Sequence, residues 1–380
     1  MEYNIPLFNL NFDEEEEKAV MEVLKSKWIS SGPKCNALEE KFAAMLGVKY
    51  AIAVSSCTAA LHLAMLAMGL GEGDEVIVPS LTFVATVNAV RYTGAIPVFC
   101  DIEGKEQITI APEQIEALIT PKTKAIVVMH YAGYACDMNK IMEIADRHNL
   151  KVIEDACHGP MSEYHGKKLG TIGNVGCFSF FSNKNISTGE GGMVVTNDEQ
   201  AYEAMKLMRS HGMTTMSYER SKGHSTNYDV VKLGYNYRLD DIRAAIGIAQ
   251  LDKLEPDIEK RNQIRASYIR HLEDDRIVIP FKADKEKSAS YIFPVVLSSG
   301  NSEQRDALRE FLAKNGVQTS VHYPPVHKFK IYEAYATKAL PNTEYVADCE
   351  FTLPMYGALT EEQIVYICEK VIEGLDAIEK

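Results

Sequence analysis

The chain has 380 residues, of which 46% are hydrophobic and 24% charged, and these proportions exclude a disordered or fibrous protein. Lys and Arg total 40 while Asp and Glu total 53, so the net charge is −13, which argues against binding to nucleic-acid phosphates. At about 150 residues per domain the length suggests two domains.

Targeting and metal signals are missing from the sequence. The N-terminal residues contain no basic segment followed by an apolar run, and no apolar run reaches the roughly 18 residues of a membrane helix. No two of the eight cysteines lie within four residues of each other, which excludes the usual zinc and iron–sulfur spacings. We therefore expect reduced core thiols, no metal, no membrane contact and a cytoplasmic location.

Hydrophobic periodicity predicts helices over 13–27 and 36–46, followed by an alternating pattern from residue 50. Short β-rich runs at 50–54, 75–78, 96–99, 125–129 and 152–154 alternate with helices that start at 58 and lie near 84–92 and 139–148. Further runs at 177–180 and 193–196 flank a polar segment, and a helix follows at 198–209. The alternation predicts an α/β domain with a mostly parallel central sheet.

The second half of the chain begins with a polar loop, expected over 210–237. Helical patterns follow at 240–251 and 256–272, then a strand at 291–297 and helices at 302–314 and 360–378. We assign residues 1–253 to a large α/β domain with an N-terminal helical segment, and residues 254–380 to a smaller α+β domain.

Two common nucleotide-binding motifs are absent. No G-x-G-x-x-G follows a predicted strand, and the sequence has no G-x-x-x-x-G-K-[ST]. This argues against a dinucleotide-dependent dehydrogenase and against a P-loop enzyme.

Three other segments could carry chemistry, each with an ordinary structural alternative. The segment VSSCTAA (54–60) opens a helix after a strand, so its amides could bind an anion, or Ser56 or Thr58 could simply cap the helix. In KVIEDACH (151–158), Asp155 ends a buried-type strand and is either a ligand group or a helix cap. In FSFFSNKN (178–185), Lys184 sits in a turn between strands, where a desolvated lysine can attack a carbonyl and an exposed one does nothing.

Together the three segments match the needs of pyridoxal 5'-phosphate (PLP). This cofactor requires an anion cradle, a carboxylate for its pyridine nitrogen and a lysine for its aldehyde. With the further segments WISSGP (28–33), VPSLTFVATVNAV (78–90), GYNYRLDDIRAAIGIAQL (234–251) and HYPPVH (322–327), the chain resembles the DegT/StrS-type nucleotide-sugar aminotransferases of the fold-type-I PLP-dependent enzymes. The resemblance runs from Trp28 to about Tyr356.

The resemblance implies roles for cofactor-binding residues. Lys184 matches the family's Schiff-base lysine, which also moves the proton, and Asp155 matches the partner of the pyridine nitrogen. It places further contacts at six positions: Thr58, Ala59 and Ser179 at the phosphate, Phe83 stacked on the ring, His158 at the ring hydroxyl, and Asn236 at the phosphate held by a neighbouring subunit. Structural alternatives stay open for His158 and for Asn236. The resemblance also places Cys157 on the ring face opposite Phe83, where the family often has Ala.

The resemblance also implies a reaction and an assembly. We expect transfer of an amino group from an amino acid, glutamate, to a nucleotide-linked keto-sugar, in a homodimer with shared active sites. Candidate substrate contacts are Ser31, Gly32, Arg238, His322 and Tyr323, and a salt bridge is the alternative for Arg238. The rival functions are a PLP-dependent sugar dehydratase or deoxygenase, whose members replace the lysine with histidine, and a non-catalytic regulatory protein on the same fold.

Overall fold

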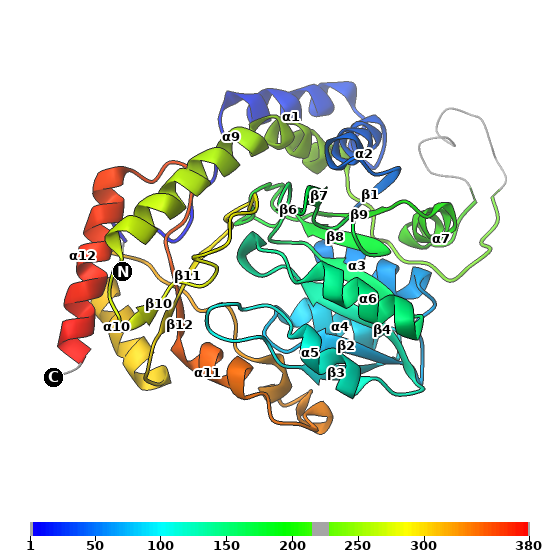
Figure 1. Ribbon diagram of the computed structural model, residues 1–380. Helices are drawn as coiled ribbons and strands as arrows, with labels where there is room; N and C mark the ends of the chain where they lie inside the picture. Colours follow the sequence, from blue (N-terminus) through cyan, green and yellow to red (C-terminus); the bar gives the residue numbers. More distant parts are fainter. Residues whose placement is uncertain (1–2, 215–227, 379–380) are drawn as a thin grey trace.

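A seven-stranded sheet forms the centre of the computed structural model, which describes residues 3–214 and 228–378 (Figure 1). The strand order is β1-β9-β8-β5-β4-β2-β3, and within this sheet β9 alone runs opposite to its neighbours. The strands are β1 (Tyr50–Val54), β2 (Glu75–Pro79), β3 (Ile96–Cys100), β4 (Thr123–Met129), β5 (Lys151–Asp155), β8 (Val175–Ser179) and β9 (Gly192–Thr196). The prediction of a mostly parallel central sheet is confirmed.

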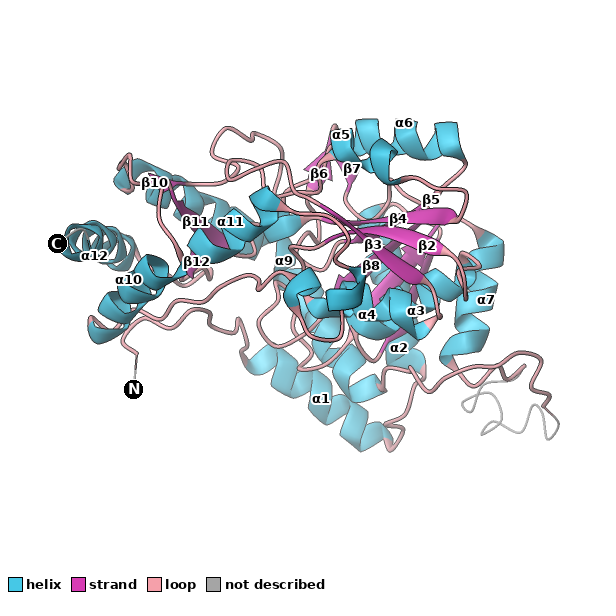
Figure 2. Cartoon of the chain, turned by 90° about the horizontal axis from the view of Figure 1, so that it is seen from below, coloured by secondary structure: helices cyan, strands magenta, loops and turns pink. Residues whose placement is uncertain are grey.

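Helices cover both faces of this sheet because its strands are apolar on both sides. In β4, Val127 packs with α3 and α4 on one face, whereas Ile126 and Val128 pack toward α6 on the other. Figure 2 shows α5 and α6 over one face and α3 and α4 over the opposite one. The helices of this part are α1 (Glu14–Ser26), α2 (Pro33–Leu46), α3 (Cys57–Ala67), α4 (Val84–Tyr92), α5 (Pro112–Ile115), α6 (Met138–His148) and α7 (Glu199–Arg209). A small hairpin, β6 (Glu163–Tyr164) and β7 (Lys167–Lys168), follows β5.

One long helix, α9 (Asp241–His271), replaces the two helices predicted over 240–251 and 256–272. Pro256 lies inside it, where it lacks an N–H for the helical hydrogen bond and normally breaks the helix. Buried residues on both sides of the proline, including Leu251, Leu254 and Ile258, hold the helix against its neighbours and offset that cost. The predicted domain boundary at 253/254 therefore falls within a continuous helix, and the division into two domains stays a prediction.

The C-terminal part contains a second sheet in the order β10-β11-β12. Its elements are β10 (Ile277–Val278), β11 (Phe293–Leu297), α10 (Ser302–Lys314), α11 (Pro341–Cys349), β12 (Glu350–Leu353) and α12 (Glu361–Ile378). The N-terminal segment joins this part, since Ile5 pairs with Val317. Strand β11 begins two residues later than predicted, which frees Tyr291 from the sheet.

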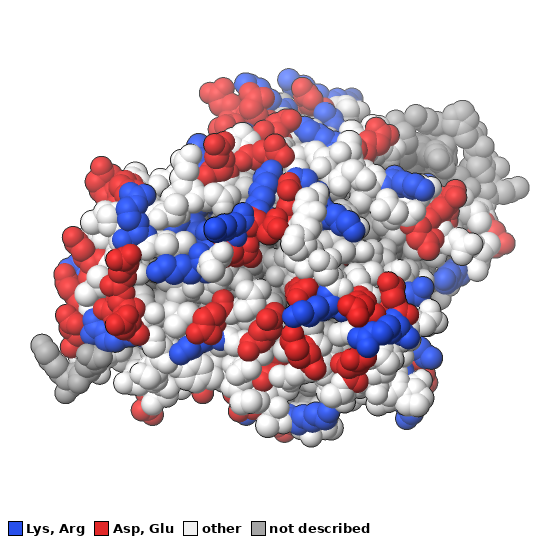
Figure 3. All heavy atoms as spheres, viewed as in Figure 1, with Lys and Arg blue, Asp and Glu red and all other residues white. Residues whose placement is uncertain are grey.

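The visible surface carries both signs of charge in close mixture (Figure 3). Residues 215–227 of the loop predicted over 210–237 lie outside the described residues. No helix in the described part of the chain combines the length and apolar character needed to cross a bilayer.

Candidate active site

A cavity of about 340 Å³ opens where β5 and β8 end and α3 begins. This edge of a parallel sheet is where α/β proteins usually bind ligands. The structure brings together there nine of the residues singled out from the sequence: Ser56, Thr58, Phe83, Asp155, Cys157, Ser179, Lys184, His322 and Tyr323. Residues that the sequence reasoning did not single out also line it, among them Tyr291, Asn183 and Glu190.

The two acidic residues that end β5 point in opposite directions, because side chains alternate along a strand. Glu154 is fully buried, bonds to His130 Nε2 at 2.9 Å and accepts three backbone amides from the 170–173 loop at 2.6 to 2.7 Å. Asp155 lines the cavity. Glu154 therefore organises a loop, and Asp155 is the carboxylate available to a ligand.

Asp155 is held by two donors that leave its carboxylate facing the cavity. Thr86 Oγ1 donates to Asp155 Oδ2 at 2.7 Å, and the Cys157 amide donates to Oδ1 at 3.2 Å. Since Thr86 has one hydroxyl proton, Thr82 Oγ1, 2.7 Å away, must donate to Thr86. Sequence reasoning missed Thr86, and its position one helical turn after Phe83 was the available signal.

The start of α3 is the segment predicted to bind the phosphate. Ser56 is the N-cap and accepts the Ala59 amide at 3.1 Å, so the capping alternative holds for Ser56 and the Ala59 amide is already used. Thr58 lines the cavity at this positive helix end. A Cβ at Gly192 would lie 2.7 Å from the Cys57 nitrogen, so glycine allows β9 to approach the helix start closely.

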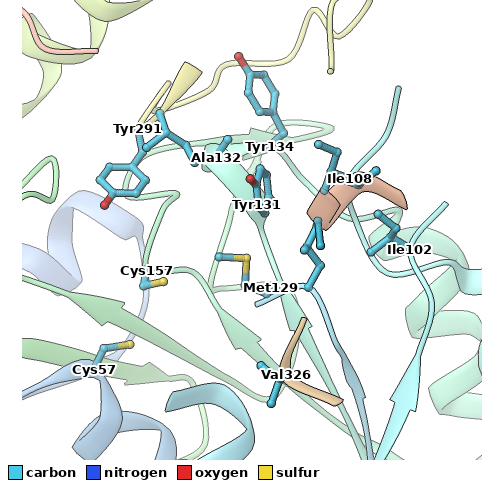
Figure 4. Close-up of a cluster of buried hydrophobic side chains, with 14 of the residues drawn as sticks. Cys57, Ile102, Ile108, Met129, Tyr131, Ala132, Tyr134, Cys157, Tyr291 and Val326 are labelled. Atoms are coloured by element: carbon cyan, nitrogen blue, oxygen red, sulfur yellow. The ribbon is translucent and has the colours of Figure 1, made fainter. Parts of the chain in front are cut away.

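Lys184 lies in the turn between β8 and β9, as predicted, with its Nζ 4.1 Å from the centre of the Tyr291 ring. Burial opposes its charge, but the neighbouring Tyr291, Cys157 and Asp155 outweigh burial and raise the pKa of Lys184. Because its pKa is raised, the Lys184 amine is charged at neutral pH when it is not bonded to a cofactor. Figure 4 shows Tyr291, Cys157 and Cys57 along one side of the buried cluster, and the same three residues line the cavity.

His158 lies behind Tyr323 and outside the cavity lining. The Ala132 amide donates to His158 Nδ1 at 3.2 Å, so Nε2 carries the proton and donates to the Tyr323 hydroxyl at 2.9 Å. Burial, together with Lys184 and His322, lowers the pKa of His158 well below its usual value, so the ring is neutral. The Tyr323 hydroxyl is left with its own proton to donate.

Aromatic rings form one side of the cavity. The centres of the Phe83 and Tyr323 rings are 5.8 Å apart, and Phe83 is 53% exposed. An apolar ring with that much exposure at a cavity mouth is available to stack on a planar ligand.

Six predicted site residues lie outside the lining of this cavity: besides Ala59 and His158, they are Ser31, Gly32, Asn236 and Arg238. Ser31 and Gly32 line a separate cavity of about 330 Å³, where the Gly32 amide donates to Asp241 Oδ1 at 2.8 Å. Asn236 is exposed and pairs with Ser210, while the backbone of Arg238 pairs with Val54 at the end of β1. Within residues 3–214 and 228–378 Arg238 has no ion-pair partner, and burial together with the positive charge of Arg209 lowers its pKa. Its substrate role and its salt-bridge alternative both stay predictions.

These residues fit PLP. A helix N-terminus, a buried carboxylate, a lysine and an exposed ring converge on one cavity, as the phosphate, pyridine nitrogen, aldehyde and ring of the cofactor require. Asn183 Oδ1, a buried oxygen at this cavity, has no hydrogen-bond partner within the described residues, which indicates a polar occupant.

Known proteins show the same architecture. The model of the DegT/DnrJ/EryC1/StrS aminotransferase family matches residues 11–372. GDP-perosamine synthase of Escherichia coli O157:H7 is 41% identical over 370 residues, covering 97% of this chain and 98% of that protein. PseC of Helicobacter pylori, an aminotransferase of pseudoaminic acid biosynthesis, superposes with a TM-score of 0.91 at 31% identity, covering 99% of this chain and 100% of PseC.

A second similar structure is that of a protein in its PLP form. The putative sugar aminotransferase Spr1654 from Streptococcus pneumoniae, in its PLP form, gives a TM-score of 0.92 at 27% identity, covering 99% of this chain and 100% of that one. The chain therefore belongs to the DegT/DnrJ/EryC1/StrS aminotransferase family and is a PLP-dependent sugar aminotransferase.

Proposed function

We propose that this enzyme transfers the amino group of glutamate to a nucleotide-linked keto-sugar. The observation that carries the proposal is the convergence of Lys184 and Asp155 on one cavity with the start of α3. The similarity to GDP-perosamine synthase and to PseC supports a sugar as the amino acceptor. The donor rests on the family resemblance alone.

PLP supplies an electron sink when it is bound. Asp155 would hold the pyridine nitrogen protonated by its negative charge, and the Thr86 hydroxyl fixes the carboxylate for that task. Thr58 and Ser179 would bind the phosphate, and Phe83 would cover the ring. Lys184 would hold the cofactor and carry the proton between the substrate carbon and the cofactor.

The rival functions fit these residues less well. A sugar dehydratase or deoxygenase of this type has histidine in place of the lysine, and this chain has Lys184. A non-catalytic regulatory protein would not need Lys184, Asp155 and Ser179 together in one cavity.

We further propose that the enzyme is a homodimer with shared sites. Asn236 is exposed and is not among the residues that line the cavity of its own chain, so its side chain is accessible to a second chain. Beside Asn236 the apolar side chains of Val230, Val231 and Leu233 are exposed by 54%, 57% and 81%, which is typical of an interface.

We also propose a cytoplasmic location. All eight cysteines of the chain are buried free thiols, as expected in a reducing compartment.

The test separates the two halves of the reaction. The purified holoenzyme is first mixed with glutamate alone, and we expect 2-oxoglutarate to appear and the visible absorption of the lysine-bound cofactor to disappear. A panel of nucleotide-linked keto-sugars is then added, and mass spectrometry should detect one amino sugar per cofactor converted. Release of a dehydrated sugar without amination would favour the dehydratase alternative.

A further inference from the structure

A buried chain of hydrogen bonds runs from β12 to the cavity. Thr352 Oγ1 lies 2.6 Å from Glu350 Oε1, to which it donates when the carboxyl is ionised, and 2.8 Å from His322 Nδ1. The His322 amide donates to the other carboxyl oxygen, Glu350 Oε2, at 2.8 Å. His322 lines the cavity, and because its Nδ1 is turned to Thr352, its second nitrogen, Nε2, is the end of the hydrogen-bond chain left for a ligand.

Glu350 is completely buried and has no cation of its own in the described part of the chain. Arg305 and Arg309 on α10 are the nearest positive groups, and both are paired with Asp306 instead. Burial raises the pKa of Glu350 to about 8, although hydrogen bonds from Thr352 and from the His322 amide act in the opposite direction.

The groups that face His322 keep its ring neutral. Burial and the positive charge of Lys184 lower the pKa of His322 to about 3. His158 is itself neutral, and the Tyr131 hydroxyl donates to the His322 carbonyl rather than to its ring. What His322 can offer a ligand is therefore decided by which of its two nitrogens carries the proton.

We propose that Glu350, acting through Thr352, determines whether His322 Nε2 donates or accepts a hydrogen bond in the cavity. The form with the proton on Nε2 donates to an oxygen of the sugar substrate. Glu350 and Thr352 are positioning residues in this scheme, and His322 is the residue that meets the substrate. This contact rests on the proposed function, because it requires a sugar in the Lys184 cavity.

The protonation state of Glu350 fixes which ring nitrogen of His322 carries the proton. An ionised Glu350 can only accept, so Thr352 donates to it and must accept from His322 Nδ1–H, which leaves an unprotonated Nε2 toward the cavity. When one proton enters at Nε2, the Nδ1 proton passes to Thr352 and the Thr352 proton passes to Glu350 Oε1. The result is a neutral carboxyl, the same hydroxyl and a His322 that donates from Nε2.

The hydrogen bonds also fix which oxygen of Glu350 carries the carboxyl proton. Because Glu350 Oε2 accepts the His322 amide, the carboxyl proton belongs on Oε1, where it points at Thr352. A glutamine at position 350 reproduces this arrangement, since its oxygen can accept the amide while its NH₂ donates to Thr352. Glu350→Gln should therefore lock His322 with its proton on Nε2 at every pH.

The first experiment reads the histidine directly. Holoenzyme labelled with ¹⁵N in its histidines is titrated from neutral to alkaline pH, and the His322 ring nitrogens are assigned with His322→Asn. In the wild type the proton on Nε2 should move to Nδ1 as Glu350 ionises, whereas in Glu350→Gln it should stay on Nε2. A His322 tautomer that does not change with pH in the wild type would overturn the proposal, whether or not the variant folds.

The second experiment measures the consequence for the substrate. The ratio of kcat/KM for the keto-sugar, Glu350→Gln over wild type, should rise about tenfold from neutral to alkaline pH, because one hydrogen bond is lost in the wild type. Glu344→Gln is the matched control, since Glu344 faces His327 outside the cavity, and its ratio should stay flat. A flat ratio for Glu350→Gln would remove the His322–sugar contact. If no keto-sugar is aminated at all, the proposed function fails, and the ¹⁵N spectra still decide the role of Glu350.

Discussion

Two neighbouring carboxylates of β5 show how far apart the tasks of adjacent residues can be. Asp155→Asn keeps the shape of the side chain but removes the charge that would hold the pyridine nitrogen protonated. One pKa unit corresponds to about tenfold in rate, so we expect turnover to fall by at least about tenfold while the thermal midpoint changes little.

Glu154→Gln is the contrasting variant. Both Glu154 oxygens accept hydrogen bonds, so an amide NH₂ in place of either one would face donors. We expect a loss of about 1–3 kcal/mol in the free energy of unfolding, measured by denaturant titration, with cofactor chemistry retained in the folded fraction. Equal effects of the two substitutions on stability and on turnover would contradict this division of tasks.

Lys184 should carry the cofactor covalently. Its Nζ lies in the cavity with Asp155, and among the cavity-lining residues it is the one with an amine. Borohydride reduction of the holoenzyme followed by peptide mass spectrometry should find the cofactor on Lys184, and Lys184→Ala should lose turnover by several orders of magnitude. Unchanged turnover in Lys184→Ala would contradict the mechanism.

Glu350 should also be visible in the pH dependence of stability. The folded protein keeps its proton up to about pH 8, whereas the ordinary value for an unfolded chain is 4.5. Between these values the folded state holds a proton that the unfolded state has released, so rising pH favours unfolding. The thermal unfolding midpoint of Glu350→Gln minus that of the wild type should therefore increase between pH 4.5 and about pH 8 and level off above it. A difference in midpoint that stays constant with pH would contradict the raised pKa of Glu350.

At the scale of elements, the start of α3 depends on its close contact with β9. A Cβ on Gly192 would lie 2.7 Å from backbone atoms of Ser56 and Cys57, which cannot move aside as a flexible side chain could. Gly192→Ala should destabilise the fold by about 1–3 kcal/mol and weaken PLP binding, measured by absorbance titration. Gly71→Ala is the control, because a Cβ there meets no atom within 4 Å, and it should leave PLP affinity unchanged.

The elements themselves follow largely from local pattern. Alternating apolar runs predicted the central sheet. Asp155 could be singled out because it ends β5, and Lys184 because it lies in the turn that follows β8. Pro256 misled the prediction, since the packing that holds α9 together comes from residues distant in sequence. Tyr291 and Glu350 were missed for a related reason: each acquires its role from a long-range contact, with Lys184 and His322 respectively, and no local spacing announces it.

At the scale of the whole molecule, the placement of Asn236 makes the assembly testable. Tyr237, the next residue, accepts the Ser55 amide through its carbonyl, so the segment runs beside the start of α3 without Asn236 entering the cavity of its own chain. A two-fold dimer would place two such segments against two cavities and form two equivalent sites. If each Asn236 serves the neighbouring site, every site needs residues from two chains.

Subunit complementation tests that arrangement. Lys184→Ala chains are mixed with chains carrying Asn236→Asp, a change that sets a negative charge against a phosphate and should inactivate the homodimer. In a mixed dimer one site contains both defects and the other contains neither. When the chains are mixed in equal amounts, half of the dimers are mixed and each of these has one intact site. Mixing should therefore restore up to about a quarter of the wild-type activity. Native mass spectrometry should first prove that mixed dimers have formed. If those dimers show no recovery, Asn236 acts in the site of its own subunit or only supports the fold. A residue that acts within its own chain leaves each site of the mixed dimer with one defect.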